Sequence, residues 1–228
     1  MPVLEWLDYA GVAVFAATGA LAASRKQLDL IGFVFLAAVT GTGGGSVRDV
    51  LLGATPVFWV DRPVYLLICT TVAVLVFFTA HLVESRYKLL LWLDAAGLAA
   101  YSVMGAAKGL AVSGSMTVAI VTGMLTATFG GVLRDLLSGE PSVLMRPEIY
   151  VTAAGIGAGA FVAADAFGLP QLAASAIGVL AAFAVRGGAL AWGWTFSPYR
   201  PRPGRNPDDL IERASAGDQP GLHRRLLE

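Results

Sequence analysis

Two short segments of this sequence place consecutive glycines next to an Arg–Asp pair inside otherwise apolar stretches. Gly41–Asp49 reads Gly-Thr-Gly-Gly-Gly-Ser-Val-Arg-Asp, and Phe129–Asp135 reads Phe-Gly-Gly-Val-Leu-Arg-Asp. An ionised side chain in the middle of a membrane span costs about 2.5–3.5 kcal/mol, so such charges commonly mark a path for ions or solutes. The candidate residues for such a path are therefore a pore kink and a set of gate charges: Gly43, Gly44, Gly45, Gly130 and Gly131, with Arg48, Asp49, Arg134 and Asp135.

The two segments belong to an internal duplication with an offset of 86 residues. Thr40–Gly53 matches Thr126–Gly139 at eight of fourteen positions, including the Gly-Gly and Arg-Asp pairs. Leu7–Leu21 matches Leu93–Ala107 at seven of fifteen positions. Alanine-rich helices can match by chance, but a shared offset for both blocks indicates a true duplication.

Consecutive glycines weaken a helix, because each costs about 1 kcal/mol relative to alanine in a helix interior. In hydrocarbon a broken helix persists only where protein or water satisfies its backbone. We expect both glycine segments to interrupt their helices and to meet at a polar constriction near the midplane. The alternative is that the glycines serve close helix packing and the Arg–Asp pairs anchor helix ends at the interface.

The arginines also need partners. Adjacent residues on a helix do not face each other, so we expect each arginine to bond away from its neighbouring aspartate. The candidate acceptors are the aspartate of the other copy and backbone carbonyls freed by the glycines.

The elements that carry these segments are apolar stretches long enough to cross a bilayer as helices, which takes about 20 residues. Hydrophobic residues make up 56% and charged residues 14% of the 228 residues, against about 25% charged in soluble domains. The sequence therefore predicts an all-α integral membrane protein. The seven predicted spans are Leu7–Ala23, Leu28–Leu52, Pro63–Val83, Leu89–Gly109, Met116–Leu137, Ile149–Phe167 and Gln171–Trp194.

Each copy of the duplication contains three spans, and an odd number inverts the second copy relative to the first in the bilayer. Inverted repeats place equivalent groups near opposite faces, which suits a path with a gate at each end. The predicted division is residues 1–87 as the first repeat, 88–168 as the second, 169–196 as an unpaired seventh transmembrane helix, and 197–228 as a partly disordered cytoplasmic tail.

The distribution of Lys and Arg predicts the orientation. With the N-terminus outside, the inner segments hold eleven of these residues and the outer segments hold only Arg62 and Lys108. By the positive-inside rule, this predicts a multi-pass protein of the cell (inner) membrane with a cytoplasmic C-terminus. The tail arginines either contact anionic membrane lipids or stay solvated. A net charge of zero disfavours nucleic acid as a partner.

Four further charges in or beside the spans are secondary candidates: Lys108, Asp8, Asp94 and Arg186. Asp8 and Asp94 open the first and fourth spans, where a carboxylate is also favoured by the helix dipole alone. Lys108 either extends to the interface or plugs a pore mouth. Arg186 lies well inside the seventh span, where it either acts in the path or simply pairs with Asp165 or a carbonyl.

The sequence contains no arrangement typical of an enzyme. There is no Ser/His/Asp or paired-carboxylate pattern, and His81 and His223 are too few to indicate a haem or metal site. We therefore expect no catalytic residues, no metal and no cofactor.

Seven spans in a three-plus-three-plus-one arrangement, with the doubled glycine and Arg-Asp motif, resemble the prokaryotic trimeric intracellular cation (TRIC) channels. They also resemble the related bacterial glycine-rich membrane domain family, some members of which are labelled glycine transporters. The resemblance covers about residues 5–195. It implies a homotrimer with an hourglass-shaped pore in each protomer, shaped by the glycine-rich kinks and conducting monovalent cations, chiefly potassium. The Lys-Glu-Val tripeptide of the animal members is absent from this sequence.

Two functions remain open at this stage. The first is a potassium-permeable channel in which the Arg–Asp pairs organise the gates. The second is a secondary carrier for a small solute such as glycine, because alternating access uses the same inverted architecture.

Overall fold

The structure is a computed structural model that describes residues 2–83, 85–145 and 148–196. The tail predicted at residues 197–228 lies outside the described residues. Within them the chain is built from helices joined by short connections. In chain order these are α1 (Pro2–Arg25), α2 (Leu30–Leu51), α3 (Phe58–Asp61), α4 (Val64–Thr79), η1 (Ala80–Leu82), α5 (Arg86–Ser113), α6 (Met116–Leu137), η2 (Val143–Met145), α7 (Val151–Ala166) and α8 (Gln171–Trp192).

Most of these helices are suited to a bilayer. Six described stretches are long and apolar enough to cross it: α1, α2, α4 with η1, α5, α6 and α8. The seventh, α7, is apolar but has only 16 residues. The predicted span Met116–Leu137 has the bounds of α6, whereas α5 is longer than predicted at both ends, and the short α3 was not predicted. The chain is an all-α integral membrane protein.

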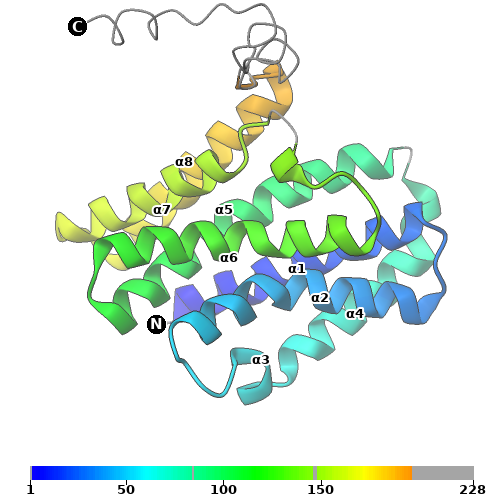
Figure 1. Ribbon diagram of the computed structural model, residues 1–228, viewed down its shortest axis with the longest axis horizontal. Helices are drawn as coiled ribbons and strands as arrows, with labels where there is room; N and C mark the ends of the chain where they lie inside the picture. The colour runs from blue at the N-terminus through cyan, green and yellow to red at the C-terminus, as the bar shows by residue number, and fades with distance from the viewer. Residues whose placement is uncertain (1, 84, 146–147, 197–228) are drawn as a thin grey trace, which may run out of the picture. The chain divides into compact units, whose positions relative to one another are not determined.

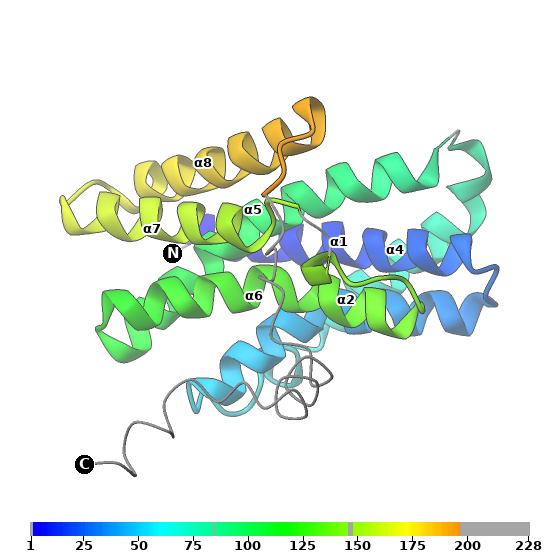
Figure 2. The ribbon, with the colours of Figure 1, turned by 45° about the horizontal axis from the view of Figure 1, so that its top comes forward.

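The helices form two inverted three-helix repeats and one additional helix. In the first half α1, α2 and α4 pack against one another, and in the second half α5, α6 and α7 do the same. The halves meet through equivalent helices, because α1 packs against α5 and α2 against α6 (Figures 1 and 2). Helix α8 lies along α7 and also contacts α5, so it packs mainly on the second half.

The ends of α2 and α6 show how closely the two copies agree. Gly53 and Gly139 follow these helices, and each has a φ of +64°, a conformation that glycine adopts without a steric penalty. In both copies the amide of the next residue donates to a carbonyl within the helix, to Asp49 at 2.8 Å and to Asp135 at 2.9 Å. The duplicated glycine therefore turns the chain back toward the Arg–Asp pair at both ends of the molecule.

The glycine segments do not interrupt their helices, so the predicted break is wrong. Both α2 and α6 are helical throughout, because the glycines are used for close approach between them. A Cβ on Gly44 would overlap the carbonyl oxygen of Thr126, and a Cβ on Gly130 would lie 2.5 Å from the carbonyl oxygen of Thr40. These contacts are equivalent in the two copies, so the crossing has the symmetry of the duplication.

Candidate functional site

The first charged cluster surrounds Asp49 near the C-terminal end of α2. Its Oδ1 atom accepts a hydrogen bond from Arg48 Nε at 2.8 Å and contacts Lys108 Nζ of α5 at 2.7 Å. Its Oδ2 atom accepts from the backbone amide of Phe58, at 3.0 Å. Asp49 and Arg48 are both buried. A buried carboxylate with this set of donors is held as an anion in a fixed position.

The second cluster surrounds Asp135 at the equivalent place on α6. Asp135 accepts from Arg134 Nε at 3.0 Å and from the amide of Val143 at 3.0 Å. Here the arginine has further partners, because Arg134 Nη1 donates to Asp94 Oδ1 at 2.6 Å and to Thr18 Oγ1 at 3.1 Å. Arg134 is 2% exposed and Asp94 is 1% exposed. The second cluster is thus a contracted, fully buried version of the first.

The expectation that each arginine bonds away from its neighbouring aspartate is wrong. The arginine side chain is long enough to turn along the helix, so its Nε atom reaches the adjacent carboxylate in both clusters. The carboxylate partner of Arg134 on another helix, Asp94, comes from the same half of the molecule. Among the described residues, ion pairs between the two halves are formed by Lys108 with Asp49 and by Arg25 and Lys26 with Glu140.

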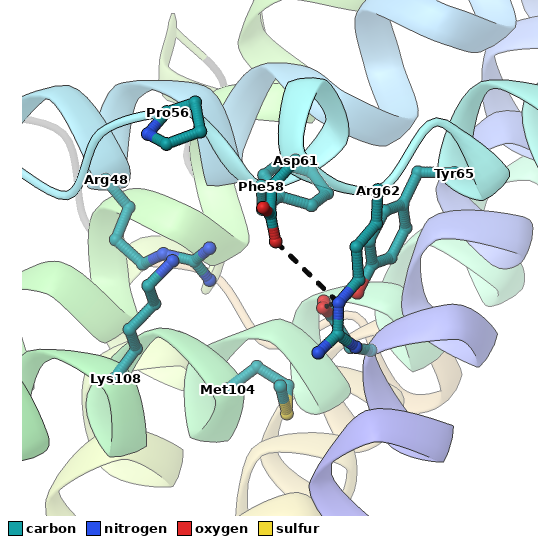
Figure 3. A pocket seen from close by; sticks show the side chains of 9 residues that line it. Arg48, Pro56, Phe58, Asp61, Arg62, Tyr65, Met104 and Lys108 are labelled. Carbon is teal, nitrogen blue, oxygen red and sulfur yellow. Dashed lines mark hydrogen bonds and ion pairs between the residues drawn. The ribbon is translucent and has the colours of Figure 1, made fainter.

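A cavity of about 240 Å³ opens beside the first cluster (Figure 3). Arg48 from α2 and Lys108 from α5 extend into it with their charged ends close together. Asp8 of α1 lines another part of its wall and accepts a hydrogen bond from the Tyr65 hydroxyl at 2.6 Å. Within the described residues no ion pair joins Asp8 and Arg48. Arg48 therefore faces the open cavity, whereas the equivalent arginine of the second cluster, Arg134, is bonded to the equivalent aspartate, Asp94.

The rim of the same cavity carries a second pair of charges. Arg62 donates to Glu5 of α1 and lies 3.8 Å from Asp61. The hydrogen bond to Glu5 raises the pKa of the Arg62 guanidinium, which remains charged at any physiological pH. The side chains of Arg62, Glu5 and Asp61 are 53%, 45% and 61% exposed, so the ion pairs of Arg62 contribute little to the stability of the fold.

The second cluster has only a cavity of about 10 Å³ beside it, lined among others by Arg134, Asp135 and Ser138. Glu140 lies at the edge of this small cavity and is held there by two cations of the first half. Lys26 Nζ and an Arg25 nitrogen lie 3.0 and 3.5 Å from the Glu140 carboxylate. The two cavities share no lining residue. One end of the molecule is therefore open and the other is closed.

The layer between the two ends is occupied by aromatic rings. On α1, Phe15 lies between Asp8 of the open end and Thr18 of the closed end, and on α5 Tyr101 lies between Asp94 and Lys108. The Phe15 and Tyr101 ring centroids are 5.2 Å apart and both side chains are buried. Rings rather than free polar groups thus fill the level at which a polar constriction was predicted.

The candidate glycines all lie at contacts between helices. Besides the close approaches of Gly44 and Gly130, a Cβ on Gly43 would lie 2.6 Å from Leu133. A Cβ on Gly45 would lie 2.6 Å from the Phe58 ring, and one on Gly131 would lie 2.5 Å from the Tyr150 hydroxyl. The structure thus brings every candidate glycine to the α2–α6 crossing or to the ring beside a charged cluster.

The secondary candidates join the same two clusters. Asp8 and Asp94 lie well inside α1 and α5, so a role as helix N-terminal carboxylates does not describe them. Lys108 bonds Asp49 instead of extending to the interface. Arg186 of α8 donates to the carbonyl of Ile149 at 3.3 Å, and its carboxylate partner is Glu148 rather than Asp165, at 2.7 Å.

Sequence reasoning missed two tyrosines. Tyr65 bonds Asp8 at the open end, and the Tyr150 hydroxyl lies beside Gly131 and Asp94 at the closed end. The two tyrosines are 85 residues apart, one fewer than the duplication offset, because Val143 follows Asp135 by one residue fewer than Phe58 follows Asp49. A self-alignment with a single gap at this point pairs the two tyrosines.

The sequence matches a family model described as glycine transporter, over residues 5–81 and 91–166. A Vibrio cholerae protein described as a UPF0126 membrane protein is 38% identical over 194 residues, covering 83% of this chain and 80% of its own length. The chain belongs to this family. Another relative, the UPF0126 inner membrane protein YadS of Escherichia coli, is 36% identical over 197 residues, covering 83% of this chain and 93% of its own.

Solved structures similar to this family member are membrane channels. One is described as the TRIC trimeric intracellular cation channel orthologue from Rhodobacter sphaeroides. It has 54% sequence identity and a TM-score of 0.83, covering 85% of this chain and all of its own. A structure described in connection with conductance through TRIC cation channels has 30% sequence identity and a TM-score of 0.78. The match covers 88% of this chain and 98% of that structure's chain. The family and these structures are membrane transport proteins and not enzymes.

Proposed function

We propose that the chain forms a cation channel: a homotrimer in which each protomer has its own pore around α2 and α6, conducting potassium and other monovalent cations. The observation that carries this proposal is the pair of equivalent Arg–Asp clusters at opposite ends of the α2–α6 crossing, one beside an open cavity and one contracted. Similarity to structures described as trimeric cation channels supports it.

In this proposal the path runs from the open cavity, past the Phe15–Tyr101 layer, to the second cluster. Arg48 and Asp49 organise one gate, and Arg134 and Asp135 organise the other. The conformation described above is non-conducting, because rings fill the middle layer and the second cavity is small. Opening requires α2 and α6 to shift against each other. The candidate glycines allow this, because no side chain at these positions obstructs the movement.

We place the open cavity on the outer side of the inner membrane and the Arg25–Lys26 turn on the cytoplasmic side. The Lys and Arg distribution supports this orientation. Residues 1–87 and 88–168 then act as the two opposed repeats, 169–196 as the extra helix, and membrane lipids contact the outer helix faces. The cytoplasmic tail falls at residues 197–228.

Recording from purified protein in planar bilayers tests the channel proposal. We expect discrete openings that carry potassium, and a reversal potential in a salt gradient that indicates cation selectivity. Silent bilayers containing intact trimers, or openings that select anions, would contradict it.

A variant at the cavity wall tests whether cations pass beside the first cluster. Lys108→Gln removes a positive charge from the wall of the open cavity, so the unitary potassium current should rise about twofold at low ionic strength. Lys88→Gln is the matched control, because Lys88 is an exposed lysine on the same helix away from the cavity. Equal currents in both variants would show that the path avoids Lys108.

A carrier for a small zwitterion such as glycine is the second candidate function. It is favoured by the chemistry of the open cavity, where Arg48 and Lys108 suit a carboxylate and Asp8 suits an ammonium group. Uptake of labelled glycine into proteoliposomes that saturates with concentration, in the absence of unitary currents, would favour the carrier over the channel.

A further inference from the structure

The equivalent carboxylates Asp8 and Asp94 have different partners in the two halves. Asp8 accepts from the Tyr65 hydroxyl, and no ion pair links it to Arg48 within the described residues. Asp94 is bonded to Arg134 at 2.6 Å, while its Oδ2 atom has no hydrogen-bond partner. At the open end the aspartate is therefore bonded to a tyrosine, and at the closed end the equivalent aspartate is bonded to an arginine.

The unused tyrosine of the closed end lies close to the aspartate. A Cβ on Gly131 would lie 2.5 Å from the Tyr150 hydroxyl and 3.3 Å from Asp94 Oδ1. Both the Tyr150 hydroxyl and Asp94 Oδ2 are buried without a hydrogen-bond partner. Burying an unpaired donor beside an unpaired acceptor is unfavourable, so a small movement of Tyr150 toward Asp94 should be favoured unless a neighbour holds the ring in place.

Helix α8 supplies that constraint. The Arg186 guanidinium carbon lies 5.0 Å from the centroid of the Tyr150 ring, within the range of a cation–π interaction. Arg186 is itself 1% exposed and is fixed by Glu148 and by the carbonyl of Ile149. The first half has no equivalent of α8, and among the described residues no arginine lies over the Tyr65 ring as Arg186 lies over the Tyr150 ring.

We propose that Asp8 and Asp94 are switch carboxylates, each exchanging a tyrosine partner for an arginine partner as its end of the protein closes. In the same proposal Arg186 is a positioning residue that holds Tyr150 away from Asp94 and so keeps the second end closed. The assignment of the switch to ion permeation rests on the proposed function, whereas the exchange of partners does not.

The exchange links bonding to the size of each cavity. Where tyrosine holds the aspartate, the arginine retains its neighbouring aspartate, lies 5.7 Å from the Phe58 ring centroid and leaves about 240 Å³ open. Where arginine holds the aspartate, about 10 Å³ remains. Releasing Tyr150 should therefore open the second end.

A cysteine-accessibility experiment on the full chain in lipid nanodiscs tests this proposal. The reporter is Ser138→Cys, which lines the second cavity, in a Cys69→Ala background; Cys69 is the chain's single cysteine and is buried. The readout is the rate of modification by a positively charged, membrane-impermeant methanethiosulfonate reagent. We expect Arg186→Gln to increase this rate by about tenfold through a shift toward the open second end.

A second substitution separates the switch from a merely structural role of Arg186. The double variant Arg186→Gln/Tyr150→Phe has no hydroxyl that can donate a hydrogen bond to Asp94. The modification rate of the Ser138→Cys reporter should therefore return close to that of the parent. Arg186→Lys keeps a cation near the ring and should restore most of the protection. Arg62→Gln, beside the equivalent tyrosine of the first half, should leave the modification rate of the Ser138→Cys reporter unchanged. A Met104→Cys reporter in the open cavity should likewise keep its rate when Arg186 is changed.

The proposal is overturned if folded Arg186→Gln protein is modified at the parent rate, or if the double variant is modified as fast as the single one. Should Arg186→Gln fail to fold, Glu148→Gln removes one of the two groups that fix Arg186, and a smaller increase is expected; no increase also overturns it. If no variant conducts ions yet the pattern of modification holds, the channel proposal fails and the switch stands.

Discussion

Gly44→Ala should lower the stability of the purified protein more than any other single-methyl change at the α2–α6 crossing. The added Cβ would overlap the backbone carbonyl oxygen of Thr126, and a backbone atom cannot rotate away as a side chain can. Overpacking of this kind costs about 1–3 kcal/mol, and we expect the upper part of that range. For a protein of this size the melting temperature should fall by about 5–10 °C.

Gly159→Ala is the matched control for this experiment. Gly159 lies within helix α7, and a Cβ there would meet no atom within 4 Å. Alanine is the better helix former by about 1 kcal/mol, so this variant should be as stable as the parent or slightly more so. Thermal denaturation of both variants in the same detergent provides the measurement. Equal melting temperatures would show that α2 and α6 do not approach through Gly44.

Asp94→Asn should be the most destabilising single change among the candidate charges. It removes the Arg134 partner at 2.6 Å, and both groups are almost fully buried. Breaking one side of a buried ion pair typically costs about 3–5 kcal/mol. Because Asp135 still holds Arg134 at 2.9 Å, we expect about 3 kcal/mol, at the lower end of this range.

The equivalent change in the first half, Asp8→Asn, should cost far less. Asp8 has no arginine partner among the described residues, and an asparagine oxygen can still accept from the Tyr65 hydroxyl. The loss should be about 1 kcal/mol, the difference between a charged and a neutral acceptor. The melting temperatures of the Asp94→Asn and Asp8→Asn variants measure the two losses. Elution of each variant at the volume of the parent protein in size-exclusion chromatography is the control for folding. Similar losses in both would mean that the two ends are in the same state.

Hydropathy and the duplication predicted most of the fold. A span of about 20 apolar residues has few alternatives to a helix in a bilayer, so the positions of α2, α6 and α8 followed directly. The short α3 was missed because four residues carry no periodic pattern. The additional turn of α5 beyond Gly109 was missed because Lys108 suggested an end at the interface, whereas it bonds Asp49 inside the protein.

The charged clusters were predicted as residues but not as a bonding pattern. The motif identified Arg48, Asp49, Arg134 and Asp135, yet which carboxylate each arginine reaches depends on side-chain conformation and on neighbouring helices. The glycines that suggested a broken helix in the sequence are compatible with a continuous one, because close packing against the facing helix compensates for their low helix propensity. A single sequence cannot distinguish these two uses of glycine, since both require the absence of a Cβ.

The unpaired helix α8 has a consequence for direction. Two equal and opposed repeats would present the same energy profile to a solute approaching from either side of the bilayer. Because α8 packs mainly on the second half, the energy profile is skewed, and an ion that crosses the protein should meet its steepest step near one leaflet. Transport should therefore rectify, and the polarity of that rectification is set by the one helix that was never duplicated.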